Sequence, residues 1–464
     1  MHDLLHPVAT VATERPVIER ASAEDLMQLA CDAGRVPWQV GAVLVLDPGS
    51  EAAVNLAAVE AVIAERITAI PRMRQVLVRT PIGLGRPLWV DDSGFDIRNH
   101  VRSLACPPPG DETALLTAAV AVVTEPLVFS RPLWSATFVT GLARARVALV
   151  VVFHHVLADG IGGLAVLANL VDGTPTPSLT AFPVPMPSHR QLALHTLRTR
   201  CANIAHPAAG LRALRHAVTE LHPASTVRVP RTSLNGPTGR QRRVTVARTN
   251  LGKIHDLAHA HGATVNDDVL TAVTGALHSL LRRRGESAES LVVSVPVSGR
   301  TATTAAQLGN RVGAMPVNLP VEGDRWERLA RIAAITRVTK TPGRGSSAAL
   351  LGPAFRALAA LGMFRWAVDR QRRVNTFVTN LRGPTQQLRF AGIPVTEILP
   401  LTGTTGNVTV SFAILSYAGT LAVTIVADPV RNPDLDILTD LLQQELSALA
   451  ADAEASQQPP TATS

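Results

Sequence analysis

The sequence predicts an α/β protein built from two domains. Strand-like runs of β-branched residues alternate with helix-like patterns in both halves of the chain, as in α/β architectures. The chain has 464 residues, which is more than one hydrophobic core usually organises. Between residues 173 and 187 stand five prolines, too many for regular structure, so this stretch is the clearest linker.

The first half of the chain contains four segments with clear strand or helix patterns. A strand is expected at residues 40–47, followed by a helix at 51–67 with apolar residues at helical spacing. A β-branched run at 146–153, bounded by polar residues, predicts a buried strand, and 160–170 predicts a buried helix. We therefore place an N-terminal domain at residues 20–172.

The second half repeats the alternation. Residues 173–230 are assigned to the linker and to basic connecting helices, whose arginine-rich face at 189–220 is either a solvated surface or a contact with lipid head groups. The C-terminal domain is expected at 231–453, and the polar tail at 454–464 is predicted to be disordered. The expected strands are 244–248, 291–297, 317–319, 376–379, 408–414 and 421–427, and the clearest helices are 269–281 and 435–449.

Composition narrows the range of partners. Apolar residues make up 46% and charged residues 17% of the chain, which fits a folded protein. The net charge of +8 attracts phosphates, anionic membranes or nucleic acid. The basic residues are spread along the chain, without the interleaved aromatic residues that a single-strand binding surface needs. The charge therefore favours a phosphorylated cofactor or a lipid surface, and no nucleic acid partner is expected.

The expected compartment is the cytoplasm. Cys31, Cys106 and Cys201 lie far apart and lack metal-like spacing, as in a reduced protein. The N-terminal stretch has an acid at Asp3 and no unbroken apolar core, so no secretory signal is expected. The longest apolar stretch, 348–364, is interrupted by a proline and an arginine, so no membrane span is expected.

The segment FHHVLADGIGG at residues 153–163 is the most informative one for chemistry. A buried strand is expected to end at Phe153, so His154 and His155 point to opposite sides and only one can face a given cavity. An imidazole can take a proton from an alcohol near neutral pH and return it to a leaving thiolate. Asp159 could hold the loop through an ion pair or a backbone cap, and Gly160 permits a close backbone approach.

Residue types alone leave three interpretations of this segment open. One histidine is a general base, or both are loop residues beside a helix-capping aspartate, or they bind a metal. The metal site is the weakest of these and is not expected, because no HExxH pattern or cysteine cluster supplies further ligands. Nucleophile motifs such as GxSxG are missing from the sequence, which favours direct transfer without a covalent enzyme intermediate.

The string HHVLADG fits the HHxxxDG signature of coenzyme A-dependent acyltransferases. Its surroundings resemble the bacterial wax ester synthase/diacylglycerol acyltransferase family across residues 20–450. The matching segments, in order, are RPLWVDDSGFDIRNHVR at 86–102, RPLW at 131–134, SLNGPTGRQRR at 233–243, GATVNDDVLTAVTGAL at 262–277, VPVSGR at 295–300, GNRVGAMPVNLP at 309–320, TNLRGP at 379–384 and SYAGTLAVTIVAD at 416–428.

The resemblance implies a fold and a set of residue roles. The fold would be two similar mixed-sheet α/β domains of the chloramphenicol acetyltransferase-like type, with a tunnel between them. His155 would be the general base, and His154 would support the loop or contribute secondarily to catalysis. Asp159 would be structural, commonly through an arginine, for which Arg300 is a candidate. Gly160 would keep the tunnel floor open.

Two further groups of residues have alternative roles. Asn266 and Asp267 either cap a helix or help to build the cavity in which an oxyanion develops. Pro132, Leu133 and Trp134 either pack in a β-rich segment or line the substrate tunnel.

Two segments extend or depart from the family pattern. NDD at 266–268 replaces the more common NDV and puts a second acid at Asp268. Residues 348–373 combine leucines and phenylalanines with arginines, and they lie against the tunnel, on a lipid surface or in an ordinary core helix.

The implied reaction is O-acyl transfer from acyl-coenzyme A, with no bound cofactor. The acceptor would be diacylglycerol, giving triacylglycerol, or a long-chain fatty alcohol, giving wax ester. Two alternatives stay open: an acceptor hydroxyl or amine on a secondary metabolite, and a lipid-binding paralogue that has lost catalysis. Peripheral contact with the inner membrane face or with lipid droplets is a further expectation.

Overall fold

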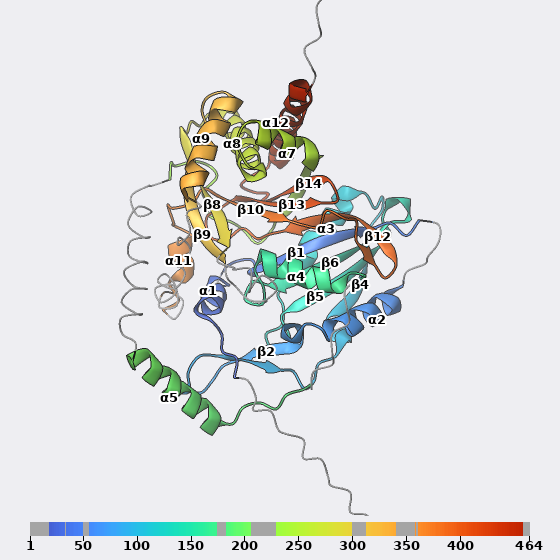
Figure 1. Cartoon of the computed structure of the whole chain (residues 1–464), viewed down its shortest axis with the longest axis vertical. Coiled ribbons are helices and arrows are strands. Elements are labelled where there is room, and N and C mark those ends of the chain that lie inside the picture. The colour runs from blue at the N-terminus through green and yellow to red at the C-terminus, as the bar shows by residue number, and fades with distance from the viewer. Residues whose placement is uncertain are drawn as a thin grey trace, which may run out of the picture.

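The computed structural model of the chain consists of two six-stranded mixed sheets with flanking helices, and a small two-stranded sheet (Figure 1). This architecture agrees with the α/β fold class that the sequence predicts. The residues described are 18–32, 34–49, 55–173, 182–205, 229–298, 312–339, 358 and 361–457.

The first sheet comes mainly from the N-terminal half. Its strands are β1 (Gln39–Leu46), β4 (Val101–Ala105), β5 (Trp134–Thr140), β6 (Val147–His154), β11 (Arg389–Phe390) and β12 (Ile393–Leu401). Their order is β11-β12-β1-β6-β5-β4. Only β4 and β5 run parallel, and the other neighbours are antiparallel. The central strands are nearly all apolar because both faces of this sheet are covered.

Helices cover both faces of the first sheet. The N-terminal helices are α1 (Ala23–Cys31), α2 (Leu56–Ile67), α3 (Glu112–Thr124), α4 (Gly160–Leu170) and α5 (His189–Ala205), and the hairpin is β2 (Gln75–Val78) with β3 (Leu88–Asp91). Helices α2 and α4 share one core with the sheet, in which Ile63 and Val166 are fully buried. Helix α3 packs on the opposite face, where alternate residues of β1 such as Val43 and Val45 point.

The second sheet comes from the C-terminal half. Its strands are β7 (Arg243–Asn250), β8 (Ser290–Ser298), β9 (Val312–Pro320), β10 (Thr376–Arg382), β13 (Val410–Tyr417) and β14 (Thr420–Ala427), in the order β7-β14-β13-β10-β8-β9. The C-terminal helices are α7 (Leu251–Ala260), α8 (Val265–Arg283), α9 (Arg325–Thr339), α11 (Phe364–Val368) and α12 (Leu435–Gln457). Residues of α7, α8, α9 and α12 share one core with this sheet.

The two halves interlock at β12. This strand follows β10 in the chain, yet it pairs with β1 in the first sheet, where Leu401 lies opposite Gly41. The Thr424 hydroxyl of β14 donates to the carbonyl of Pro400 at 2.5 Å and so joins the sheets. No strand was predicted at this position, where Pro394 and Pro400 are residues that rarely stand inside a sheet.

Two predicted segments reach the limits of the described residues. Helix α5 is described from His189 to Ala205, and the rest of the predicted helical stretch to residue 220 lies outside the described residues. Helix α12 continues to Gln457, whereas the sequence predicted disorder from residue 454. Residues 458–464 lie outside the described part. A search of the described helices finds none long and apolar enough to cross a membrane.

Candidate active site

The two histidines stand where β6 ends. Strand β6 lies between β1 and β5, with His154 opposite Gln39 and Phe153 opposite Trp134. A turn follows at residues 155–157, and α4 begins at Gly160. This path places the HHVLADG segment at the end of a fully buried strand, as the sequence predicted.

Asp159 is the N-cap of α4. Its carboxylate accepts a hydrogen bond from the backbone N–H of Gly162 at 2.7 Å, and the residue is only 2% exposed. A capping contact of this kind satisfies one of the free N–H groups in the first helical turn. Asp159 therefore positions the turn that carries the histidines. The arginine considered as its partner, Arg300, lies outside the described residues.

His154 is buried and held on several sides. Its Nδ1 accepts the backbone N–H of Val156 at 3.0 Å, which places the ring proton on Nε2. Nε2 lies 3.3 Å from a carboxylate oxygen of Asp32, and the ring makes a T-shaped contact with Phe129. At 1% exposure, this ring has no open side for a substrate.

His155 is the more accessible of the pair. Its backbone N–H donates to the carbonyl of Trp38 at 3.0 Å, and its ring is stacked on the Trp38 indole with centroids 5.2 Å apart and an interplanar angle of 11°. The side chain is half-buried, in contrast to that of His154. The geometry therefore favours His155 over His154 as the residue that meets a substrate.

The sequence missed the residues that hold Trp38 in place. Asp32 accepts the backbone N–H of Trp38 at 2.7 Å with one oxygen, and its other oxygen lies beside His154. Gln28 accepts the indole N–H at 2.6 Å. Gln28 and Asp32 belong to α1 and its C-cap, and Trp38 directly precedes β1, which pairs with β6, so no local motif in the sequence signals them.

The PLW segment supports the histidine strand from the other side. Pro132, Leu133 and Trp134 are all buried, and the Leu133 carbonyl accepts the backbone N–H of His154 at 3.0 Å. The Trp134 indole N–H donates to Met73 at 2.7 Å. These contacts are those of packing residues; a place in a tunnel wall stays a prediction.

Gly160 lies against the second sheet. A Cβ built at this position would stand 3.1 Å from a methyl group of Leu381 on β10, closer than side chains normally approach. The glycine therefore lets the start of α4 pack against the C-terminal half.

Asn266 and Asp267 lie behind β10. Asn380, the neighbour of Leu381, donates to the Asn266 side chain at 3.3 Å. Consecutive strand residues point to opposite faces, so Asn266 is on the far side of β10 from Gly160. Asp267 forms a capping box with Thr264 and also accepts the Thr336 hydroxyl at 2.7 Å. Its carboxylate is thus engaged in capping and in joining α8 to α9.

Comparison with known proteins decides the family. Residues 22–269 match the model of the wax ester synthase/diacylglycerol acyltransferase catalytic domain, and residues 308–450 match the C-terminal domain of the same group. The chain belongs to the wax ester synthase/diacylglycerol acyltransferase family. The resemblance found in the sequence is therefore confirmed.

Relatives of the wax ester synthase/diacylglycerol acyltransferase family cover nearly the whole chain. A probable diacylglycerol O-acyltransferase of Mycobacterium tuberculosis H37Rv is 31% identical over 419 residues, which are 85% of this chain and 87% of the relative. The wax ester synthase/diacylglycerol acyltransferase of Marinobacter aquaeolei VT8 superposes with a TM-score of 0.66 at 22% identity, over 94% of this chain and 100% of that one. The first condensation domain of the calcium-dependent antibiotic synthetase follows with a TM-score of 0.63 at 18% identity, over 94% and 98% of the two chains. These structures share the fold.

Metal ligation has no support in the described residues, which contain no group of three or more His, Cys, Asp or Glu side chains arranged to hold an ion. In the HHVLADG segment, Asp159 caps α4 and His155 is stacked on Trp38.

Proposed function

We propose that this chain transfers a fatty acyl group from acyl-coenzyme A to an alcohol, with His155 as the general base. The acceptor is diacylglycerol, a long-chain fatty alcohol or both. The single observation that carries the proposal is the family match across both domains. The contrast between a half-buried His155 and a fully buried His154 supports the choice of base.

In the proposed reaction, Nε2 of His155 takes the proton of the acceptor hydroxyl as its oxygen attacks the thioester carbonyl, because Nδ1 is buried. The tetrahedral intermediate then collapses, its carbon–sulfur bond breaks, and the thiolate recovers the proton from His155. The products are an ester and free coenzyme A. General acid–base help of this kind contributes about 10²- to 10⁴-fold to the rate. A tunnel between the two halves would bring the two substrates together and exclude water.

The test is release of free thiol from palmitoyl-coenzyme A by the purified protein. Diacylglycerol, hexadecanol, or no acceptor is added in parallel. Release that depends on diacylglycerol or hexadecanol supports the proposal and names the acceptor. If release required some other hydroxyl or amine, the acceptor would be a secondary metabolite. If no acceptor gave release, the non-catalytic alternative would be favoured.

A lipid surface is the proposed place of action. Leu361, Met363 and Trp366 are 71%, 44% and 56% exposed, an unusual group of large apolar side chains on a protein surface. Exposed arginines surround them at positions 365, 370, 372 and 373. We call residues 361–373 the α11 patch. Apolar side chains beside cations are typical of segments that lie in the interface of anionic membranes.

Replacing Trp366 and Leu361 with alanine together with Arg372 and Arg373 with glutamine is expected to weaken membrane binding. Each arginine near an anionic surface contributes about 1 kcal/mol, so the loss of two, with the apolar anchors, predicts a drop of at least about 30-fold in partitioning. Co-sedimentation with vesicles of phosphatidylglycerol measures it.

Val430→Ala is the matched control for the α11 patch, since Val430 is 76% exposed and lies outside it. It should bind vesicles as the wild type does. Equal binding of the fourfold variant and the wild type would show that the α11 patch does not contact lipid.

A further inference from the structure

Trp38 lies directly beside the histidine turn, just before β1. The first residue of β1, Gln39, pairs with His154, the last residue of β6. One position beyond this pair, the carbonyl of Trp38 accepts the backbone N–H of His155 at 3.0 Å. The two side chains therefore start from adjacent points at the ends of neighbouring strands.

Polar contacts from α1 hold the indole of Trp38. Its ring N–H donates to the side-chain oxygen of Gln28 at 2.6 Å, and its backbone N–H donates to Asp32 at 2.7 Å. Gln28 lies in α1 and is 8% exposed, and Asp32 is the C-cap of the same helix. Because the indole is held through its N–H and through its backbone, it has little freedom to turn.

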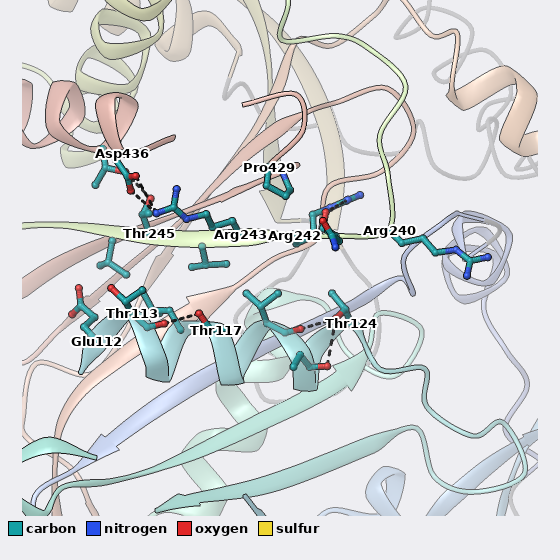
Figure 2. A pocket seen from close by; sticks show the side chains of 17 residues that line it. Glu112, Thr113, Thr117, Thr124, Arg240, Arg242, Arg243, Thr245, Pro429 and Asp436 are labelled. Atoms are coloured by element: carbon teal, nitrogen blue, oxygen red, sulfur yellow. Dashed lines mark hydrogen bonds and ion pairs between the residues drawn. The ribbon is translucent and has the colours of Figure 1, made fainter. Parts of the chain in front are cut away.

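The backbone at Trp38 is fixed a second time through its neighbour Gln39. The Gln39 amide is buried and donates to the carbonyls of Val123 and Glu125 at 2.8 and 2.9 Å. These carbonyls lie at the C-terminal end of α3, whose last residue, Thr124, is labelled in Figure 2. The start of β1 is thus tied both to α1 and to α3.

A groove of about 700 Å³ runs between α3 and β7 beside this end of α3 (Figure 2). We call it the α3–β7 groove. Thr124 is one of its lining residues, whereas Trp38 and His155 are not among those that line it in the described part of the chain. A replacement at Trp38 therefore tests the histidine site rather than the shape of this groove.

The His155 ring lies nearly parallel to the indole of Trp38. The ring centroids are 5.2 Å apart and the planes differ by 11°, as in an offset stack. Since the indole is itself held in place, the stack fixes the plane of the imidazole and the direction of its nitrogen atoms. Proton transfer needs such a fixed direction, because the base must lie within hydrogen-bond reach of the hydroxyl.

The stack also places an electron-rich surface against a ring that becomes a cation. When Nε2 of His155 takes the proton of the acceptor hydroxyl, the imidazole turns into an imidazolium. The face of an indole carries partial negative charge and attracts a cation that lies within about 6 Å of it. This attraction is stronger for the imidazolium than for the neutral ring, so it acts mainly as the proton is transferred.

We propose that Trp38 is a positioning residue for the general base. Its indole fixes the plane of the His155 ring and stabilises the imidazolium, and α1 holds the indole through Gln28 and Asp32. Trp38 exchanges no proton, because the proton passes from the acceptor hydroxyl to His155 and then to the leaving thiolate. This role rests on the proposed acyltransferase function, since it assigns a partner to the base of that reaction.

The first test compares Trp38→Leu with Trp38→Phe in thiol release from palmitoyl-coenzyme A. Trp38→Leu removes the aromatic face and should lower kcat about 3- to 30-fold, with each KM within about twofold of the wild type. Trp38→Phe keeps an aromatic face and should recover most of this loss. Trp326→Leu is the matched control and should leave kcat unchanged, because Trp326 on α9 is stacked on His261 at 4.5 Å and 9°.

Two patterns of these kinetic constants would contradict the positioning role. A raised KM at unchanged kcat in Trp38→Leu would make Trp38 a substrate contact instead. Equal losses of kcat in Trp38→Leu and Trp38→Phe would show that the aromatic face does not matter.

The second test observes the stack in solution without turnover. The chain has five tryptophans, so protein labelled with 5-fluorotryptophan should give five fluorine NMR signals, and the one that Trp38→Phe removes belongs to Trp38. His155→Ala takes a ring off this indole and should move that signal, as should Gln28→Leu, which removes the acceptor of the indole N–H. His261→Ala, the matched control, should move the signal of Trp326 and leave that of Trp38 in place. A Trp38 signal that is the same in the wild type and in His155→Ala would overturn the proposal.

The outcomes separate this proposal from the proposed function. A wild type that releases thiol in the presence of an acceptor, with a Trp38→Leu variant of equal kcat, would keep the function and remove the positioning role. A wild type that releases no thiol with any acceptor would remove the function, and the positioning role with it, even where the fluorine signals show the stack.

Discussion

Replacing His155 with alanine is expected to lower kcat by about 10²- to 10⁴-fold, the usual contribution of a general acid–base residue. The fold should survive, because the ring is only half-buried and is stacked on Trp38. Loss of one aromatic stack costs only about 0.5–1.5 kcal/mol. Thiol release from palmitoyl-coenzyme A gives kcat, and thermal unfolding shows whether the fold is intact.

His154→Ala is the informative comparison, because His154 is fully buried whereas the adjacent His155 is half-buried. Removal of this ring takes away the Nδ1 acceptor of the Val156 N–H and leaves a cavity beside Asp32 and Phe129, at a position that is only 1% exposed. It should therefore lower the Tm clearly, whereas His155→Ala should not. A His155→Ala protein with wild-type turnover would refute the assigned base, and equal Tm losses in both variants would refute the distinct roles.

The sequence predicted those features that depend on patterns of neighbouring residues. Helix 160–170 matches α4 residue for residue, because an N-cap aspartate and a glycine mark its start. Strand β6 and the histidine turn were likewise visible in a β-branched run followed by HHVLADG. The family likeness then supplied the two-sheet fold, which the topology confirms.

The features that depend on distant segments were invisible in the sequence. Strand β12 contains two prolines, and its pairing with β1 and β11 stabilises it as a strand. Trp38 precedes β1 of the same sheet, and Asp32 reaches His154 from the C-cap of α1. The α3–β7 groove requires knowledge of how the halves pack, which no periodicity encodes. Arg300 lies outside the described residues, so its pairing with Asp159 stays a prediction.

Asp268 is the site of the second large effect, this time on stability. It is fully buried in the first turn of α8, and neither carboxylate oxygen has a hydrogen-bond partner among the described residues. Burial, with a smaller contribution from the charge of Asp267, raises the pKa of Asp268 to about 8. In an unfolded chain an aspartate has a pKa of about 3.9. The folded protein therefore holds a proton here that the unfolded chain releases between about pH 4 and pH 8.

The sign of the pH dependence follows from this difference. A group that keeps its proton only in the folded state makes folding less favourable as the pH rises through the window, at about 1.4 kcal/mol per pH unit. Asp268→Asn removes the titration and keeps a side chain of similar shape. We expect it to stabilise the protein by about 3–5 kcal/mol at pH 8 and by less than about 2 kcal/mol at pH 5. Urea unfolding followed by circular dichroism at both pH values measures the change.

Asp440→Asn is the matched control, since Asp440 is exposed on α12 and the same charge is removed there. It should change the free energy of unfolding by no more than about 0.5 kcal/mol at either pH, as expected for a surface position. Asp268→Val should gain further, because it leaves no buried polar atom. If wild type and Asp268→Asn lose stability equally between pH 5 and pH 8, another group accounts for the pH dependence and Asp268 is ionised in the folded protein.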